Sequence, residues 1–347
     1  MMEDIYELLK SLCEIPGPVG RETLVQDSIK KHLLPFCSEI DQDKIGNLMA
    51  TMEGTSRHYA IVAHADEVGF LVSCIDENGF LRAKWNTQGY MPDLRLLPGQ
   101  RVLIMTDSGM VPGCFSVKTA HIAGPEGKKK IPSWEEVFID VGARSSDDVS
   151  GLGINIGDPV VYDTETKRVG KNIVGKTFDD RVGLAVIVKV AERLSEVPKK
   201  DRPTVTFVSS VLEEVGAKGV AAIANKLDVD GVIVAEVGLA DDYPGTKGEA
   251  GVSLGKGPVV VVKDSQIVYS HEQNSSLIIT AEANEIRIQR AVYHNYATDG
   301  FQIASHGQIV SVVAVPCRYT HSSFEAIDIS DVESTISLIS QFLLDSK

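Results

Sequence analysis

Cysteine is scarce in this sequence, and the few cysteines present do not form pairs. They are odd in number, widely spaced and without a CxxC pattern: Cys13, Cys37, Cys74, Cys114 and Cys317. Disulfide frameworks and thiolate zinc sites need paired or closely spaced cysteines, so the sequence predicts neither. Scattered thiols are typical of a reducing compartment, and we therefore expect a cytoplasmic location.

Long hydrophobic runs and an excess of positive charge are also absent. No apolar run approaches the roughly 18 to 20 residues that a membrane span requires, and residues 1–10 lack the basic start of a signal peptide. The chain has 34 Lys and Arg against 48 Asp and Glu, a net charge of −14. Binding to phosphates requires concentrated Lys and Arg, so we expect neither a nucleic-acid nor a membrane partner.

The pattern along the 347 residues predicts two domains, because single cores usually stop growing at about 250–300 residues. Apolar runs typical of buried strands alternate with helical periods at both ends of the chain. The expected strands are 59–63, 204–210, 231–235 and 309–315, and the expected helices are 5–12, 21–34, 182–194, 215–227 and 331–344. Such alternation predicts an α/β fold with a largely parallel sheet and helices on both faces.

The middle of the chain has a different residue pattern. From 68 to 162, short β-rich pieces are separated by turns and few helical periods occur. We therefore expect a small β-rich domain at 68–162, inserted into an α/β domain formed by 1–67 and 163–347.

Potential metal ligands follow the predicted strands or begin a predicted helix. They are His64, Asp66, Asp179, Asp180, Glu213, Glu214, Glu236 and His321. Each has an ordinary explanation, such as a hydrogen-bonded histidine, a helix cap or a solvated acidic surface. Sites in open α/β sheets, however, form outside the carboxyl ends of the strands, so these side chains should converge. Crowded carboxylates would repel one another, and His with carboxylate suits Zn²⁺, Co²⁺ or Mn²⁺.

Four segments carry a more specific signal when they are taken together. They are HADEVG at 64–69, FDDRVG at 178–183, EEVG at 213–216 and PCRYTHS at 316–322. In this order they resemble the tetrahedral aminopeptidases, the family that includes bacterial and archaeal glutamyl aminopeptidases. Two further segments, 241–245 and 297–300, are similar to other parts of that family. The resemblance extends over nearly the whole chain.

The resemblance implies two divalent metal ions per subunit, with zinc or cobalt as the expected metal. Asp179 would bridge the two ions. His64 and Glu236 would complete the ligands of one ion, and Glu214 and His321 those of the other. The family usually has Asp at the position of Glu236, and Glu can reach the same ion with a longer side chain.

The resemblance also implies the catalytic roles. Glu213 would be the general base and acid, Asp66 would orient His64, and the Asp179-Asp180 junction would be a strained or cis peptide. The expected activity is removal of N-terminal residues from short peptides, with the free α-amine bound at the metal centre. Relatives use the inserted domain for oligomerisation, so a homo-oligomer such as a tetrahedral dodecamer is expected.

Three other functions compete with this interpretation. A carboxypeptidase or deacylase could use the same two-metal site. A glycoside hydrolase would need two acids facing each other across a sugar at about 5–9.5 Å, whereas the acids here are interleaved with His64 and His321. A non-catalytic binding or assembly protein would have no need of Glu213 beside a ligand set.

Overall fold

The computed structural model describes residues 4–55, 57–88, 91–127, 129–246 and 248–346. These residues form two compact units. The first unit comprises the described residues of 1–67, 166–320 and 325–347, and the second those of 68–165 and 321–324. The predicted inserted domain, 68–162, lies within the second unit.

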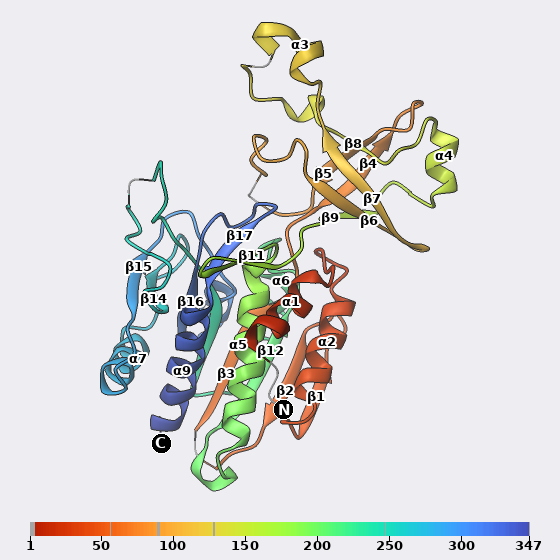
Figure 1. Ribbon diagram of the computed structural model, residues 1–347. Coiled ribbons are helices and arrows are strands. Elements are labelled where there is room, and N and C mark those ends of the chain that lie inside the picture. The colour runs from red at the N-terminus through yellow and green to blue at the C-terminus, as the bar shows by residue number, and fades with distance from the viewer. Residues whose placement is uncertain (1–3, 56, 89–90, 128, 247, 347) are drawn as a thin grey trace. The chain divides into compact units, whose positions relative to one another are not determined.

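The first unit is built on a large mixed sheet (Figure 1). Its strands lie in the order β1 (Glu39–Gln42), β2 (Leu48–Met52), β12 (Thr204–Ser210), β3 (His58–His64), β13 (Gly231–Leu239), β16 (Val310–Cys317), β14 (Val259–Lys263) and β15 (Gln289–Val292). The four central strands β12, β3, β13 and β16 are parallel to one another. The β1–β2, β2–β12 and β14–β16 pairs are antiparallel, and β15 is parallel to β14.

Helices cover both faces of this sheet because successive side chains of its buried strands point to opposite faces. In β3, Ile61 and Ala63 pack into one core, whereas Ala60 and Val62 pack into the other. The first core is covered by α1 (Ile5–Glu14), α2 (Thr23–Leu33), α5 (Phe178–Ser195), α7 (His271–Ala283) and α9 (Ile329–Asp345). The second is covered by α6 (Lys218–Ala221), η3 (Ala224–Lys226) and α8 (Gly300–Ser305).

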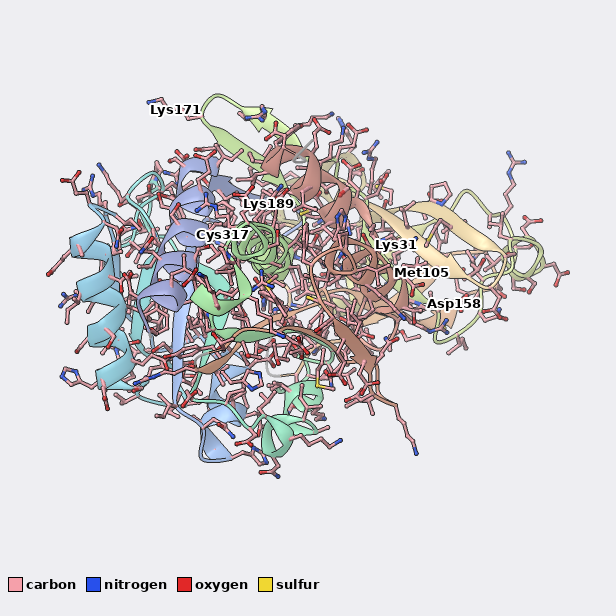
Figure 2. The ribbon with its side chains drawn as sticks, turned by 90° about the horizontal axis from the view of Figure 1, so that it is seen from below. Lys31, Met105, Asp158, Lys171, Lys189 and Cys317 are labelled. Carbon is pink, nitrogen blue, oxygen red and sulfur yellow. The ribbon has the colours of Figure 1, made fainter. Side chains whose placement is uncertain are left out.

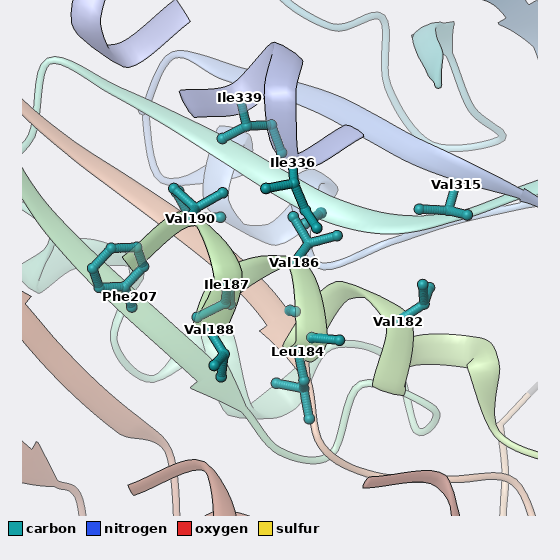
Figure 3. Close-up of a cluster of buried hydrophobic side chains, with 14 of the residues drawn as sticks. Val182, Leu184, Val186, Ile187, Val188, Val190, Phe207, Val315, Ile336 and Ile339 are labelled. Atoms are coloured by element: carbon teal, nitrogen blue, oxygen red, sulfur yellow. The ribbon is translucent and has the colours of Figure 1, made fainter. Parts of the chain in front are cut away.

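Helix α5 is the central helix of the first core. Its side chains from Val182 to Ala191 are all buried. Figure 3 shows Val186 and Val190 of this helix beside Ile336 of α9, with Phe207 of β12 nearby. Apart from Lys189, this stretch is apolar or glycine on every side, and such a helix has to be enclosed, which explains why α5 is packed between the sheet and other helices.

A small antiparallel sheet completes the first unit. It consists of β10 (Lys167–Val169), β11 (Asn172–Gly175) and β17 (Glu325–Asp328). In Figure 2, Lys171 projects outward from the turn between β10 and β11. The short helix η2 (Lys199–Asp201) leads into β12.

The second unit is a closed antiparallel barrel with its own hydrophobic core. Its strands are β4 (Phe70–Ile75), β5 (Leu81–Trp85), β8 (Phe138–Asp140), β7 (Gly109–Ser116), β6 (Arg101–Thr106) and β9 (Pro159–Tyr162). The helical pieces α3 (Ala120–Gly127), η1 (Trp134–Glu136) and α4 (Ser146–Gly151) connect them, and α3 is broken at Gly124. Phe70 contacts the rings of Phe115, Trp134 and Tyr162, which fills the barrel with aromatic side chains.

The predicted fold class is confirmed: a largely parallel sheet with helices on both faces is interrupted by a small β domain. The predicted helix over 215–227 is wrong. This segment contains a turn followed by the short helices α6 and η3. Gly216 and Ala217 have left-handed backbone conformations, which end a right-handed helix, and this explains the break. Within the described ranges, no helix combines the length and the apolar character needed to cross a lipid bilayer.

Candidate metal centre

Three of the predicted ligands, His64, Glu214 and Glu236, lie with Glu213 where neighbouring strands end or approach their carboxyl ends. His64 is the last residue of β3 and is paired in register with Ser210, the last residue of β12. Glu213 and Glu214 follow β12 closely, and Glu236 lies on β13 on the other side of β3. The parallel arrangement therefore brings together side chains that are far apart in the sequence, as the pattern of strand ends predicts.

His64 lies at the centre of this group and is buried. Its Nε2 atom is 3.0 Å from Oδ1 of Asp179 and 3.7 Å from Oε2 of Glu236. Two sets of three residues present possible ligand atoms within 4.8 Å of one another: His64 with Asp179 and Glu214, and His64 with Asp180 and Glu236. These two sets share His64, so they form one continuous cluster.

The other nitrogen of His64 determines which tautomer a metal would meet. Its Nδ1 atom is 3.1 Å from the backbone carbonyl oxygen of Asp66 and 3.6 Å from Oδ1 of the same residue. A carbonyl oxygen can only accept a hydrogen bond, so Nδ1 carries a proton and donates it. Nε2, which faces Asp179 and Glu236, is therefore the nitrogen that would bind a metal ion once its own proton is displaced, and this is the usual arrangement of a metal-ligating histidine.

Asp66 also holds the loop that carries the two glutamates. The backbone N–H groups of Glu213 and Glu214 donate to Oδ1 and Oδ2 of Asp66, both at 3.0 Å. Asp66 is fully buried. One residue therefore connects the orientation of His64 to the positions of Glu213 and Glu214.

The peptide bond between Asp179 and Asp180 is cis, as predicted. Asp180 is fully buried, and its carboxylate accepts hydrogen bonds from the backbone N–H of His64 at 3.1 Å and of Gly183 at 3.0 Å. A Cβ at Gly183 would lie 2.4 Å and 2.5 Å from the two carboxylate oxygens of Asp180, so a larger residue there would displace that side chain. On the other side, the backbone N–H of Asp179 donates to Oε2 of Glu325 at 3.2 Å.

The electrostatics of the cluster favour bound cations. Burial raises the pKa of Glu236 well above its usual range, and the neighbouring Asp180 and Asp179 raise it further. Burial likewise raises the pKa of Glu213. Burial alone would lower the pKa of His64, but Glu236 and Asp179 raise it well above its ordinary value. A buried imidazole among several carboxylates is a donor set that suits a divalent ion such as Zn²⁺, and such an ion would replace the proton on Nε2.

His321 is not among the residues that these two sets bring together. It belongs to the segment 321–324, which packs with the second unit, and it has a left-handed backbone with a φ of 62°. Within that unit it lines a small pocket with Trp85, Tyr162 and the segment 68–70. Its role as a ligand stays a prediction.

Two acidic residues lie beside the ligand set that the resemblance implies but are not part of it. Asp180 is among the potential metal ligands that the sequence groups, and its buried carboxylate lies beside His64 and Glu236. Glu325, which is buried on β17, holds the amide of Asp179. Sequence reasoning misses Glu325, because it stands outside the motifs at the start of an ordinary short strand.

Comparison with known proteins gives consistent results. The family model of the M42 glutamyl aminopeptidases matches residues 46–338. The lysyl aminopeptidase of Pyrococcus furiosus is 29% identical over 350 residues, covering 99% of this chain and 97% of the relative. The structure of a TET aminopeptidase from a marine-sediment Thaumarchaeota archaeon is similar, with a TM-score of 0.92, 32% identity and coverage of 98% and 96% of the two chains. The TET1 peptidase of Pyrococcus horikoshii, which can assemble into a tetrahedron or a large octahedral shell, has a TM-score of 0.88, 27% identity and coverage of 98% and 99%.

Proposed function

The chain belongs to the M42 glutamyl aminopeptidase family and is an aminopeptidase, and we propose that it uses two divalent metal ions held around His64 to trim short peptides. The observation that carries this proposal is the double contact of Asp66. Its backbone oxygen accepts from Nδ1 of His64, while its carboxylate holds the amides of Glu213 and Glu214. A ligand and a general base are thus held by the same residue.

We assign the ligands as the family resemblance implies. Asp179 would be a ligand of both ions, His64 and Glu236 would complete the ligands of one, and Glu214 and His321 would complete those of the other. The distances of 3.0 Å and 3.7 Å from Nε2 of His64 to Asp179 and Glu236 support the first set. Possible ligand atoms of Glu214, Asp179 and His64 lie within 4.8 Å of one another, and this supports Glu214 as a ligand of the second ion. Zinc and cobalt are the metals we propose, since both accept imidazole and carboxylate ligands.

When bound, such ions supply Lewis-acid chemistry, because they lower the pKa of water toward neutrality and polarise the scissile carbonyl. Glu213 takes the proton of the attacking water and later returns it to the departing amine. Its partly exposed side chain allows contact with substrate, and its raised pKa suits a group that has to accept and then donate a proton. Asp66 holds His64 in the tautomer that leaves Nε2 available for a ligand role.

The experiment that tests this proposal is the substitution Glu213→Gln. The variant should retain its metal ions and lose nearly all hydrolysis of aminoacyl chromogenic amides, assayed with Zn²⁺, Co²⁺ or Mn²⁺ added back in turn. General acid–base catalysis usually contributes roughly 10²-fold or more. A variant that keeps more than about a tenth of the wild-type kcat would contradict the assignment of Glu213 as the general base.

A second measurement separates an aminopeptidase from a carboxypeptidase or a deacylase at the same centre. A dipeptide with a free α-amine should be cleaved, and the same dipeptide with an acetylated amine should not. Cleavage of both at similar rates would mean that the free amine is not recognised.

We further propose that the inserted domain, 68–162, mediates assembly into a closed homo-oligomer in the cytoplasm. The support for this is the Pyrococcus horikoshii relative, which can assemble into a tetrahedron or a large octahedral shell. Light scattering on the purified protein should give a mass many times that of one 37.5 kDa chain. A mass near that of a monomer or dimer over a wide concentration range would reject the closed assembly.

A further inference from the structure

The loop that carries Glu213 and Glu214, residues 211–219, has an unusual backbone; we call it the glutamate loop. Leu212 has a φ of 59°, Gly216 of 97° and Ala217 of 53°. Left-handed conformations are unfavourable for residues other than glycine, so contacts from outside the loop have to maintain them at Leu212 and Ala217.

The two ends of the glutamate loop lie against each other. A Cβ built on Gly219 would be 1.8 Å from the carbonyl oxygen of Val211, so this closure requires a glycine at 219. The loop also has internal hydrogen bonds, from the backbone N–H of Gly216 and of Ala217 to the carbonyl of Glu213, both at 2.8 Å. The loop is therefore a closed turn, and the position of its two glutamates depends on how its ends are joined.

A single side chain from another part of the chain joins these ends. Oδ1 of Asn47 accepts from the backbone N–H of Val211 at 3.1 Å, and its Nδ2 donates to the carbonyl oxygen of Gly219 at 2.9 Å. Asn47 is fully buried. Both ends of one carboxamide are thus used to connect the first and the last residue of the glutamate loop.

Asn47 is itself held firmly in the turn between β1 and β2. Asp43 accepts from the backbone N–H of Asn47 at 3.0 Å and from its Nδ2 at 2.7 Å. Gln26 of α2 donates from Nε2 to the carbonyl of Gly46 at 3.0 Å and to that of Ser209 at 2.9 Å. The turn that presents Asn47 is therefore tied to the end of β12, where the glutamate loop begins.

We propose that Asn47 is a positioning residue for hydrolysis: it closes the glutamate loop and thereby sets where Glu213 and Glu214 stand relative to His64. This inference rests on the proposed function of those two glutamates. Asp66 holds the middle of the loop through the amides of Glu213 and Glu214, and Asn47 holds its ends. The side chain of Asn47 acts through the loop, since it bonds to the backbone of the loop's two ends and to Asp43 rather than to a proposed ligand.

Hydrogen exchange on the metal-free protein tests the closure without reference to activity. In Asn47→Ala, amides of 211–219 should exchange roughly threefold to tenfold faster than in the wild type, as expected for the loss of one or two hydrogen bonds. Asn274→Ala is a matched control, because Asn274 is also buried and donates to a strand carbonyl, that of Val261 at 3.1 Å. The control should leave exchange in the glutamate loop unchanged. Unchanged exchange in Asn47→Ala would overturn the proposal.

Kinetics test the consequence for catalysis. At saturating metal, Asn47→Ala should lower kcat roughly tenfold to hundredfold, the range expected when a catalytic group is misplaced by about 1 Å, with little change in KM. In a Glu213→Gln background the same substitution should cause a clearly smaller loss, because one of the two groups that it positions is already gone and only Glu214 remains to be displaced. An equal loss in both backgrounds would mean that Asn47 only stabilises the fold, and would overturn the proposal.

A second variant opens the same closure from the other side. Gly219→Ala should reproduce the loss of kcat, since its Cβ would lie 1.8 Å from the carbonyl oxygen of Val211 and 2.8 Å from Oδ1 of Asn47, and would force the two ends of the loop apart. It keeps the proposal testable if Asn47→Ala does not fold. If Glu213→Gln itself remains fully active, the proposed general base is wrong, whereas the exchange result still decides whether Asn47 closes the loop.

Discussion

Replacing Asp66 by Asn tests whether one buried carboxylate organises the metal centre. The substitution preserves the size of the side chain and its burial. It removes the negative charge beside Nδ1 of His64, where Oδ1 lies 3.6 Å away. It also replaces one of the two oxygens that accept from Glu213 and Glu214 with an amide group that cannot accept.

The expected loss can be worked out from these contacts. Each hydrogen bond from a backbone N–H to the Asp66 carboxylate is 3.0 Å long, and bonds to charged groups are worth about 1.5–3 kcal/mol. An asparagine keeps one of them and turns an N–H donor toward the other backbone N–H. If that energy normally holds Glu213 in its reactive position, kcat should fall roughly tenfold to 150-fold, since about 1.4 kcal/mol corresponds to a factor of ten.

The assay measures kcat with a chromogenic aminoacyl amide at saturating metal, and metal content by elemental analysis after dialysis. Asp331→Asn is the matched control. Asp331 is also buried, and its two oxygens accept from the backbone N–H groups of Gly255 and Gly257, both at 2.7 Å. None of these contacts involves the metal centre, so the control should keep a kcat near that of the wild type. A wild-type kcat in Asp66→Asn, or an equal fall in both variants, would refute the reasoning.

Three further predictions concern metal binding, thiol reactivity and pH. Asp179→Ala should lose more metal on dialysis than His64→Ala because it removes a proposed ligand of both ions, and elemental analysis showing full retention in both variants would contradict the ligand assignment. Iodoacetamide should label the exposed Cys74 and spare the buried Cys13. Burial raises the pKa of Cys13 to about 12, so its reactive thiolate form is roughly a thousandfold rarer than that of an ordinary cysteine. Rapid labelling of Cys13, detected by peptide mapping, would contradict this prediction. Burial raises the pKa of Asp331 to about 6, so the folded protein binds the proton of this carboxyl group more tightly than the unfolded chain does. The stability that this proton adds is present below about pH 4 and is lost as the pH rises through about 6. Between pH 4 and 7 the free energy of unfolding of the wild type should therefore fall relative to that of Asp331→Asn, by about 1–3 kcal/mol in urea titrations, and a pH-independent difference would argue against the shift.

Much of the fold could be predicted because the central strands are rich in apolar residues and buried along nearly their whole length. The run before His64 and the run before Glu213 are buried on both faces, and this makes them recognisable without an alternating pattern. The polar residues that follow such runs lie just beyond the carboxyl ends of the strands. This is why the amino-acid sequence alone is enough to group His64, Asp66, Glu213 and Glu214.

The segment 215–227 shows where periodicity is insufficient. Its apolar residues have helical spacing, yet Gly216 and Ala217 adopt left-handed conformations and only 218–221 and 224–226 are helical. The ends of the loop there are joined by Asn47, which is more than 160 residues away in the sequence. Helix propensity depends on neighbouring residues alone and contains no information about such a long-range contact, so the tertiary structure overrides it.

The site shows a related limit. Adjacent aspartates at 179 and 180 are indistinguishable by residue type, yet their side chains have different partners. Asp179 lies near Nε2 of His64, whereas Asp180 accepts from the backbone N–H of the same residue. Glu325 could not be identified because its partner, the backbone N–H of Asp179, is 146 residues distant in the sequence.

The position of β3 has a consequence for how the chain folds as it is synthesised. This strand lies between β12 and β13, and β1 and β2 do not pair with it. Both neighbours are encoded after the whole inserted barrel, so the N-terminal 67 residues emerge from the ribosome with an apolar strand whose two edges have no partner. The barrel can form during this interval, since the strands described for it pair with one another. Folding of the first unit has to wait until residue 239 has been made, and unpaired strand edges of this kind are where nascent chains aggregate or recruit chaperones.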